Sequence, residues 1–166
     1  WKILFQKSCQ KNGIRRSRGS GIKAKGSIKA GQIITKICLG GLGRVTISSI
    51  HFGKKNFPSI SVSTNYPAIS TLGSQLAGWQ IKSGNFQALG SGPARALALK
   101  PKSVFEKIAY KDDYNETVLV LETDKEPPRD IISSVAESCC VKINKLNIVL
   151  VPITSISGLA QVSGRV

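Results

Sequence analysis

Two continuous apolar runs in the second half of the chain constrain its fold most. Residues 117–121 read TVLVL, and residues 148–153 form the second run. Apolar residues at successive positions, rather than at alternate ones, are typical of strands covered on both faces. Between the runs, Pro128 opens a segment with helical spacing, whose apolar side holds Ile131, Ile132, Val135, Ala136 and Cys139. This order predicts an α/β fold with layered, mixed β-sheets and helices packed against them.

The rest of the chain predicts further strands and helices. Strands are expected over residues 44–52, 59–64 and 79–81, and an apolar, β-branched run at 33–39 stops at two glycines. A helix is expected from Pro67 to Gly78, capped by Asn65 and with an apolar stripe of Ile69, Leu72 and Leu76. Other helices are expected at 94–99, at 103–110 and from about Leu159 onward.

Composition divides the chain into three segments. Residues 1–31 form a basic, glycine- and serine-rich segment without sustained period, read as irregular. Residues 32–105 form a first α/β portion, and residues 106–166 form a second one that is incomplete at its C-terminus. The first residue is Trp1, which suggests that the sequence starts inside a longer gene product.

Charge is distributed unevenly along the 166 residues, whose net charge is +15. All nine acids lie between Glu106 and Glu137, while residues 1–105 carry seventeen Lys or Arg and no acid. Such a field attracts polyanions, so nucleic acid is one candidate partner. The basic residues are dispersed and no nucleic-acid-binding motif accompanies them, which disfavours a specific reader. A surface adapted to a salt-rich cytosol stays open as the other explanation.

Cysteine and histidine usage indicates no metal site. Cys9, Cys38, Cys139 and Cys140 have no zinc spacing, and the single histidine, His51, is expected to be structural or exposed. Reduced thiols buried as small apolar groups in a cytoplasmic protein fit the cysteines better than disulfides. No apolar run reaches the length of a membrane-spanning helix.

The sharpest local motif is a glycine loop that leads into a helix. It consists of Gly90, Ser91, Gly92, Pro93, Ala94 and Arg95. Glycines let backbone N–H groups approach an anion closely, the helix start adds its positive dipole end, and Arg95 adds a charge. The motif predicts a phosphate or carboxylate site. An ordinary tight loop before a helix is the competing explanation.

Several longer strings then resemble one family closely. They are CLGGLGRV (38–45), YPAISTLGSQLAGWQ (66–80), ALGSGPARALALKPK (88–102), YKDD (110–113), VLVLE (118–122) and TSISGLAQVSGRV (154–166). This chain resembles methenyltetrahydromethanopterin cyclohydrolase of one-carbon metabolism, from about Gly13 to Val166. Family members are about twice as long. The resemblance therefore implies roughly the N-terminal half of a two-domain subunit, which forms a homotrimer in its relatives.

The resemblance implies a hydrolytic reaction on a pterin. Water adds to the methenyl carbon of 5,10-methenyltetrahydromethanopterin, and the ring opens to the 5-formyl product. Because the bridge is already an electrophilic amidinium, no metal or cofactor is implied, and tetrahydromethanopterin is the carrier of the substrate. The site must supply a base for the water, donors for the tetrahedral centre and an anchor for the anionic tail.

The resemblance also assigns site residues. Arg165 matches a family arginine that precedes a glutamate by three residues, and that glutamate would come two residues beyond Val166. The loop Gly90, Ser91, Gly92, Pro93 and Arg95 is the expected substrate-binding element. Without the glutamate the 166 residues alone are expected to have little activity. The alternative function is a basic, non-catalytic module that binds a polyanion.

This chain departs from the family pattern at a few positions. Gly19, Ser20 and Gly21 stand where relatives commonly show Asp-Cys-Gly, and Asn65-Tyr66 where they show Asp-His. Lys23 and Lys29 stand where glutamates are expected. These changes bear on the N-terminal strand and on part of the pocket lining.

Overall fold

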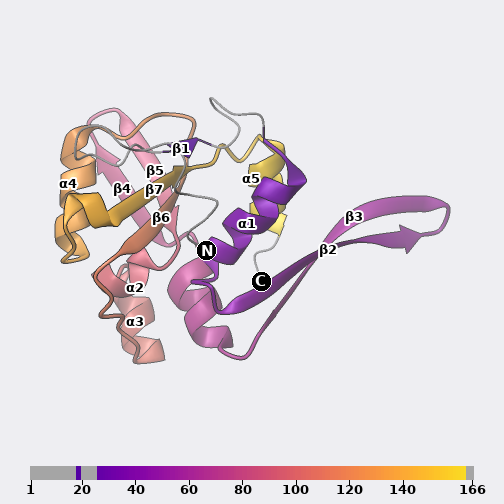
Figure 1. Cartoon of the computed structure of the whole chain (residues 1–166), viewed down its shortest axis with the longest axis horizontal. Coiled ribbons are helices and arrows are strands. Elements are labelled where there is room, and N and C mark those ends of the chain that lie inside the picture. The colour runs from indigo at the N-terminus through magenta and orange to yellow at the C-terminus, as the bar shows by residue number, and fades with distance from the viewer. Residues whose placement is uncertain (1–17, 20–25, 164–166) are drawn as a thin grey trace.

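The computed structural model describes residues 18–19 and 26–163, with residues 18, 19, 162 and 163 described through their backbone only. A five-stranded sheet with helices on both faces forms the body, and a long two-stranded hairpin extends from it (Figure 1). The strands are β1 (Arg18–Gly19), β2 (Gly43–Phe52), β3 (Lys55–Thr64), β4 (Trp79–Ser83), β5 (Phe86–Ser91), β6 (Thr117–Glu122) and β7 (Leu146–Leu150). The helices are α1 (Ile28–Cys38), η1 (Ala68–Gln75), α2 (Ala94–Ala98), α3 (Lys102–Ile108), α4 (Arg129–Ser138), η2 (Ile143–Lys145) and α5 (Ile156–Ser163).

The body sheet is mixed, with the strand order β1-β7-β6-β5-β4. β6 and β7 are parallel and are connected through α4, whereas β4, β5 and β6 pair in antiparallel fashion. The two apolar runs contribute the neighbouring strands β6 and β7 in the interior of the sheet. β7 ends at Leu150, so the second run leaves the sheet earlier than predicted, and its Ile153 is exposed. The predicted α/β class is therefore confirmed.

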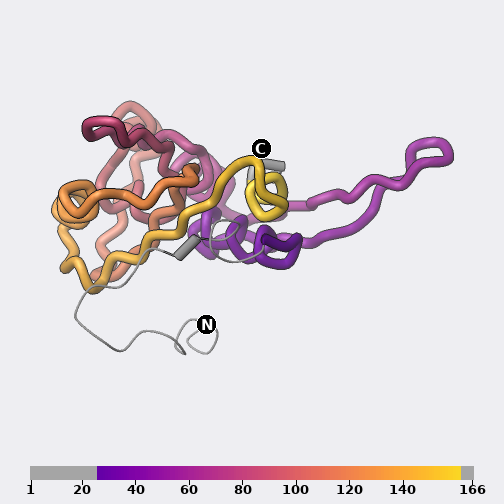
Figure 2. The backbone as a smooth tube through the Cα atoms, turned by 90° about the horizontal axis from the view of Figure 1, so that it is seen from above, coloured from indigo at the N-terminus to yellow at the C-terminus, as the bar shows by residue number. Residues whose placement is uncertain are grey.

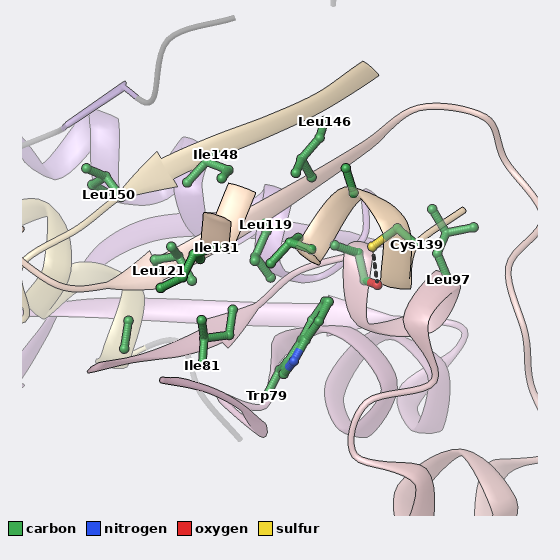
Figure 3. Close-up of a cluster of buried hydrophobic side chains, with 14 of the residues drawn as sticks. Trp79, Ile81, Leu97, Leu119, Leu121, Ile131, Cys139, Leu146, Ile148 and Leu150 are labelled. Atoms are coloured by element: carbon green, nitrogen blue, oxygen red, sulfur yellow. Dashed lines mark hydrogen bonds between the residues drawn. The ribbon is translucent and has the colours of Figure 1, made fainter. Parts of the chain in front are cut away.

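One face of the sheet carries the larger core (Figure 3). Leu119 and Leu121 of β6 point to this face, together with Ile148 of β7, and α2 and α4 cover them. Leu119 and Leu121 are fully buried, and each such side chain contributes about 1.5–3 kcal/mol relative to an exposed one.

The opposite face is covered by α1. Ile34 and Cys38 of this helix pack against Val120 and Val149, the residues of β6 and β7 that point away from the larger core. The β-branched run at 33–39 thus lies mostly in a helix. Ser27 begins this helix, because its side-chain oxygen accepts a hydrogen bond from the N–H of Ala30 at 3.1 Å.

The hairpin of β2 and β3 leaves the body as an arm (Figure 2). Ten residue pairs are in antiparallel register, from Gly43 opposite Thr64 to Phe52 opposite Lys55. The arm is anchored at its base, where the side-chain amide of Gln32 donates to the carbonyl of Val45 at 2.7 Å. Both strands were predicted, but β3 begins four residues earlier than expected.

The η1 helix has its polar and small face inside, which corrects the sequence prediction. Ser70, Gly73, Ser74 and Gln75 are buried, whereas Leu72 and Leu76 of the predicted apolar stripe are exposed. The reason is close packing, since a β-carbon at Gly73 would lie 3.0 Å from Ile108 of α3. The expected Asn65 cap is also wrong. The first residue before the helix is Pro67, without a side-chain cap.

Other differences concern element bounds. β5 was not predicted as a strand, and α5 begins at Ile156 rather than near Leu159. The segment limits proposed at 31/32 and 105/106 fall inside α1 and α3. The division into three portions therefore stays a prediction that does not follow the element bounds.

Candidate functional site

The predicted glycine loop lies at the end of β5, beside β6. Gly90 is paired with Leu121 and Ser91 with Val120. Gly92 has a φ of +106°, and a β-carbon there would lie 3.0 Å from the carbonyl oxygen of Val118. Only glycine satisfies both conditions at this position. The N–H of Gly92 donates to the carbonyl of Ser74 at 2.7 Å, which joins the loop to η1.

Arg95 is fully buried, and its guanidinium links three elements. Its Nε donates to the carbonyl of Lys100 at 2.9 Å, and its Nη1 donates to the carbonyls of Leu76 at 2.5 Å and Ser74 at 3.4 Å. The group also lies over the ring of Phe105, 5.8 Å from its centroid. Desolvation by burial lowers the pKa of Arg95 to about 10, so the side chain stays cationic at neutral pH.

The sequence predicted that Arg95 adds its positive charge to an anion site, but its contacts direct the guanidinium toward backbone carbonyls. Two of its three nitrogens, Nε and Nη1, donate hydrogen bonds to backbone carbonyls. The third, Nη2, lies close to Gly78 and has no hydrogen-bond partner in the described residues. The charge thus compensates the carbonyl end of η1 instead of facing an open loop. α2 has only five residues, so its dipole is small. Substrate binding by Gly90–Arg95 remains a prediction, and Pro93 alone among these residues is partly exposed.

Ser91 supplies the second polar group of the loop. Its side chain is fully buried, and its Oγ has no hydrogen-bond partner among the described residues. Buried hydroxyls without a partner are uncommon, and Thr117 Oγ1 of β6 is a second one in the described residues. The neighbouring η1 ends in a π-helical hydrogen bond, from the N–H of Leu76 to the carbonyl of Thr71 at 2.8 Å. The whole of η1, from Ala68 to Gln75, is π-helical, and π-helical turns occur frequently at functional sites.

Three contacts hold α5 against α1. The N–H of Ser27 donates to Ser157 Oγ at 3.0 Å, and that hydroxyl lies 3.2 Å from the carbonyl of Ser27. Gly31 lies against Ala160, and the amide of the buried Gln161 lies 3.8 Å from Cys38 Sγ. The segment that leads to residue 164 is thereby fixed to the sheet through α1. The predicted catalytic Arg165 itself lies outside the described residues.

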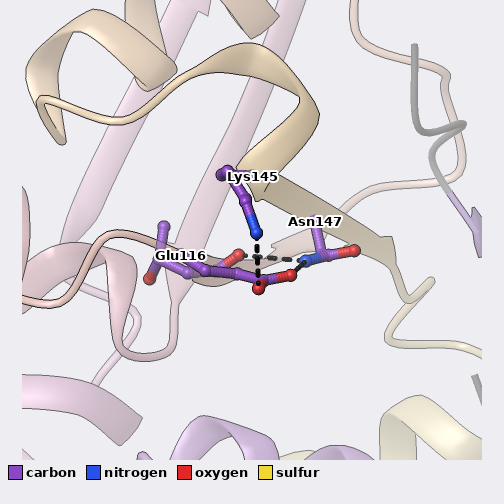
Figure 4. A network of polar contacts seen from close by, with 4 residues as sticks. Glu116, Lys145 and Asn147 are labelled. Carbon is purple, nitrogen blue, oxygen red and sulfur yellow. Dashed lines mark hydrogen bonds and ion pairs between the residues drawn. The ribbon is translucent and has the colours of Figure 1, made fainter. Parts of the chain in front are cut away.

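The acidic segment contains an ion pair at its surface (Figure 4). Glu116 Oε2 lies 3.5 Å from Lys145 Nζ, and the side-chain amide of Asn147 donates to Glu116 Oε1 at 3.4 Å. Asp112 accepts hydrogen bonds from the N–H groups of Asp113 and Tyr114, as in an Asx turn. Within residues 18–19 and 26–163, no three His, Cys, Asp or Glu side chains converge as metal ligands would.

The described cysteines are free thiols, as expected. Cys38 and Cys139 are buried, but Cys140 is exposed, which corrects the expectation that all are buried. Burial, and secondarily the neighbouring Cys140, raises the pKa of the Cys139 thiol to about 12. Its Sγ lies 3.4 Å from the carbonyl of Ala94 at the start of α2. His51 is exposed on β2, and no helix in the described part of the chain is long and apolar enough to cross a membrane.

A model of the family described as cyclohydrolase (MCH) matches residues 18–166. The chain belongs to this cyclohydrolase family. It is 48% identical over 148 residues to a protein named methenyltetrahydromethanopterin cyclohydrolase from Methanothermobacter marburgensis. Proteins of the same name are 46% identical over 148 residues in Methanocaldococcus jannaschii and 45% identical over 145 residues in Methanospirillum hungatei. The resemblance inferred from the strings is confirmed.

The similarity covers most of this chain but less than half of its relatives. The match to the Methanothermobacter cyclohydrolase spans 88% of this chain and 46% of that protein. In the described residues, the family match begins at the short strand β1 and includes the glycine loop, the arm and α5. The chain thus spans about half the length of the curated relatives it matches, as expected.

Proposed function

We propose that this chain serves in the hydrolysis of 5,10-methenyltetrahydromethanopterin to 5-formyltetrahydromethanopterin, in cytoplasmic one-carbon metabolism. The observation that carries the proposal is the family match over residues 18–166, with relatives at 44–48% identity that bear this name. The described fold adds a loop with strict glycine geometry and a buried, unpaired hydroxyl at Ser91. The substrate is a small pterin, and the complete enzyme is a homo-oligomer, with a trimer expected from the family.

The reaction follows from the electrophilic bridge of the substrate. A water oxygen forms a bond to the methenyl carbon while a base takes the proton, and the amidinium nitrogens lose their positive charge. The bond from this carbon to N10 then breaks. N10 keeps the electron pair and takes a proton, while the hydroxyl on the carbon loses its proton and becomes the carbonyl of the formyl group that stays on N5. General-base assistance of the first step is worth about 10²–10⁴-fold in rate.

Arg165 is proposed to act beside that base. An arginine near a carboxylic acid favours the ionised carboxylate form and orients that group. The carboxylate can then accept a proton from water. The contacts between α1 and α5 support this role, because they fix the helix that ends at Ser163, two residues before Arg165. The loop Gly90–Gly92 is proposed to anchor a polar group of the pterin through Ser91.

A direct test follows the absorbance of the methenyl pterin. Purified protein is added to 5,10-methenyltetrahydromethanopterin, and the loss of the amidinium chromophore is recorded together with formation of the 5-formyl product. A catalysed loss that yields this product supports the proposal. Binding of the pterin without turnover even in a chain joined to the remaining part of a relative refutes it.

A further inference from the structure

Ser74 of η1 is held between α1 and the glycine loop. Its hydroxyl donates to the carbonyl of Cys38 at 2.5 Å, and its own carbonyl accepts the N–H of Gly92 at 2.7 Å. Nη1 of Arg95 lies 3.4 Å from the same carbonyl. Ser74 is buried, so these hydrogen bonds are shielded from water and are stronger for it. The residue thus joins the end of one helix to the turn that follows β5.

The contact with Cys38 satisfies a carbonyl at the C-terminal end of α1. The last four carbonyls of a helix have no partner within the helix. Residues 39–41 donate their N–H groups to the carbonyls of residues 35–37, and the Ser74 hydroxyl supplies a donor for the next carbonyl, that of Cys38. A β-carbon at Gly40 would lie 3.3 Å from Ser74 Oγ, so the two segments pack closely. The hydroxyl therefore fixes η1 relative to the helix that covers the sheet.

Cys38 connects this contact to α5. It is fully buried, and the side-chain amide of Gln161 lies 3.8 Å from its Sγ. Cys38 also packs in the smaller core with Val120 of β6, which is paired with Ser91 of β5. Because directly paired residues of antiparallel strands share a face, Ser91 points to the side of the sheet that α1 covers. The residue that contacts α5 thus lies on the same face of the sheet as Ser91.

The proposed function places its two working groups at the ends of this series of contacts. Ser91 is proposed to anchor the pterin, and Arg165 follows α5 by two residues in the sequence. An anchor and a reacting group must keep a fixed separation, since a displacement of about 1 Å can cost about 10²-fold in rate. Within the described residues, the contacts from α5 through Cys38 and Ser74 to the glycine loop connect the two groups.

We infer that Ser74 is a positioning residue for the proposed hydrolysis. Its hydroxyl fixes the glycine loop relative to α1 and, through Cys38, relative to α5. Ser91 then holds the pterin at a set distance from the proposed catalytic arginine, while Ser74 itself does not touch the substrate. The inference rests on the proposed function, because it needs Ser91 as the anchor. A hydroxyl with a merely structural role would change stability without changing how the substrate is aligned.

Ser70 offers a matched control. It is a second serine of η1, four residues earlier, and it is buried as well. Its Oγ lies 3.2 Å from Thr64 Oγ1 at the base of the arm, whereas Ser74 Oγ reaches α1. Ser70→Ala and Ser74→Ala therefore remove the same group from the same helix at similar burial. Melting temperatures of both variants verify that they are folded.

The first test measures kcat and KM of residues 1–166 joined to the remaining part of the Methanothermobacter marburgensis relative. Ser74→Ala is expected to lower kcat at least about tenfold with KM changed by less than about threefold, because the binding groups stay in place but are misaligned. Ser70→Ala should stay within about twofold of the wild type in both constants. In a Ser91→Ala background, Ser74→Ala should lower kcat by less than about twofold further, since the anchor that it positions is already absent.

Three kinetic results would overturn the inference while leaving the hydrolysis established. They are a wild-type kcat in Ser74→Ala, equal losses in Ser70→Ala and Ser74→Ala, and losses of Ser74→Ala and Ser91→Ala that multiply fully in the double variant. The first would show that the hydroxyl does not matter to the reaction. The other two would show that it acts through the general stability of η1 and not through the loop.

A second test needs no turnover. Amide hydrogen exchange of the 166-residue chain, followed by NMR, reports how firmly the N–H of Gly92 is held. Ser74→Ala is expected to speed this exchange at least about tenfold, and Ser70→Ala to leave it unchanged. An inactive joined wild-type protein whose Gly92 responds in this way refutes the proposed function and supports Ser74 as the residue that fixes the loop. Unchanged exchange at Gly92 in Ser74→Ala overturns the inference whatever the activity.

Discussion

Gly31 of α1 lies so close to Ala160 of α5 that a β-carbon at position 31 would overlap the alanine methyl group. The same β-carbon would lie 2.9 Å from the carbonyl oxygen of Ser157. The absence of a side chain at one position thus sets how closely the last described helix packs on the helix that covers the sheet. Because α5 ends two residues before Arg165, this contact bears on the proposed site.

Gly31→Ala is therefore expected to push α5 away from α1. Overpacking of this kind typically costs about 1–3 kcal/mol, and this loss should appear in the free energy of unfolding measured with urea. Lys29→Ala, on the exposed side of the same helix, is the control and should stay within about 0.5 kcal/mol of the wild type. Equal stability of the glycine and alanine forms would mean that α5 does not rest on α1 as described.

Arg95 is expected to stabilise the fold rather than only to bind an anion. Arg95→Met removes the hydrogen bonds that Arg95 donates to the carbonyls of Lys100 and Leu76, and leaves both partly buried carbonyls without this donor. Charge-assisted bonds of this type contribute about 1.5–3 kcal/mol each, so a loss of several kcal/mol or failure to fold is expected. Arg95→Lys should also be destabilised, because one ammonium cannot replace the planar fork.

The control variant is Arg129→Ala. Because Arg129 is exposed at the start of α4, this variant is expected to be about as stable as the wild type. The melting temperatures of Arg95→Met, Arg95→Lys and Arg129→Ala show whether Arg95 stabilises the fold. If Arg95→Met folds with wild-type stability but loses affinity for the pterin, then Arg95 is a binding residue and the structural role assigned to it is wrong.

The two adjacent cysteines are expected to react at very different rates. Burial raises the pKa of Cys139 to about 12, whereas Cys140 is exposed. Because the thiolate is the reactive form, a maleimide at pH 8 should label Cys140 quickly and Cys139 only after unfolding. Peptide mapping by mass spectrometry measures both. Rapid labelling of Cys139 in the folded chain would contradict its buried position.

The same shift has a consequence for stability at high pH. The folded state holds the Cys139 proton more tightly than the unfolded state, whose thiol has its ordinary pKa of 9.0. Stability is therefore unaffected by this group below pH 9 and falls as the pH rises from 9 toward 12. Cys139→Ala should remove this contribution, which a comparison of unfolding at pH 8 and pH 10 detects.

The body of the fold followed from the sequence because its signals are local and strong. The runs around Leu119 and Ile148 are typical of strands covered on both faces, and Pro128 marked the start of the helix between them. η1 was placed correctly but turned the wrong way. Its spacing suggested Leu72 as buried, whereas close contact of Gly73 with α3 decides which face lies inside. Such a contact has no local signature.

The site was predicted less completely than the fold. The glycine loop was found from its residues alone, because Gly92 has a backbone conformation that only glycine adopts easily. The burial of Arg95 was missed. Its carbonyl partners, Ser74 and Leu76, lie about twenty residues earlier, and nothing near Arg95 in the sequence marks them. The contact of Gly31 with Ala160 is equally nonlocal.

The central proposal is that this chain serves in the hydrolysis of a methenyl pterin. Its most direct test joins residues 1–166 to the remaining part of the Methanothermobacter marburgensis relative and records the loss of methenyl-pterin absorbance. The joined protein should hydrolyse the pterin, its Arg165→Ala variant should be slower by about 10²-fold or more, and the 166 residues alone should be much slower than the joined protein. A folded joined protein without activity, or one whose rate is unchanged in Arg165→Ala, would contradict the account.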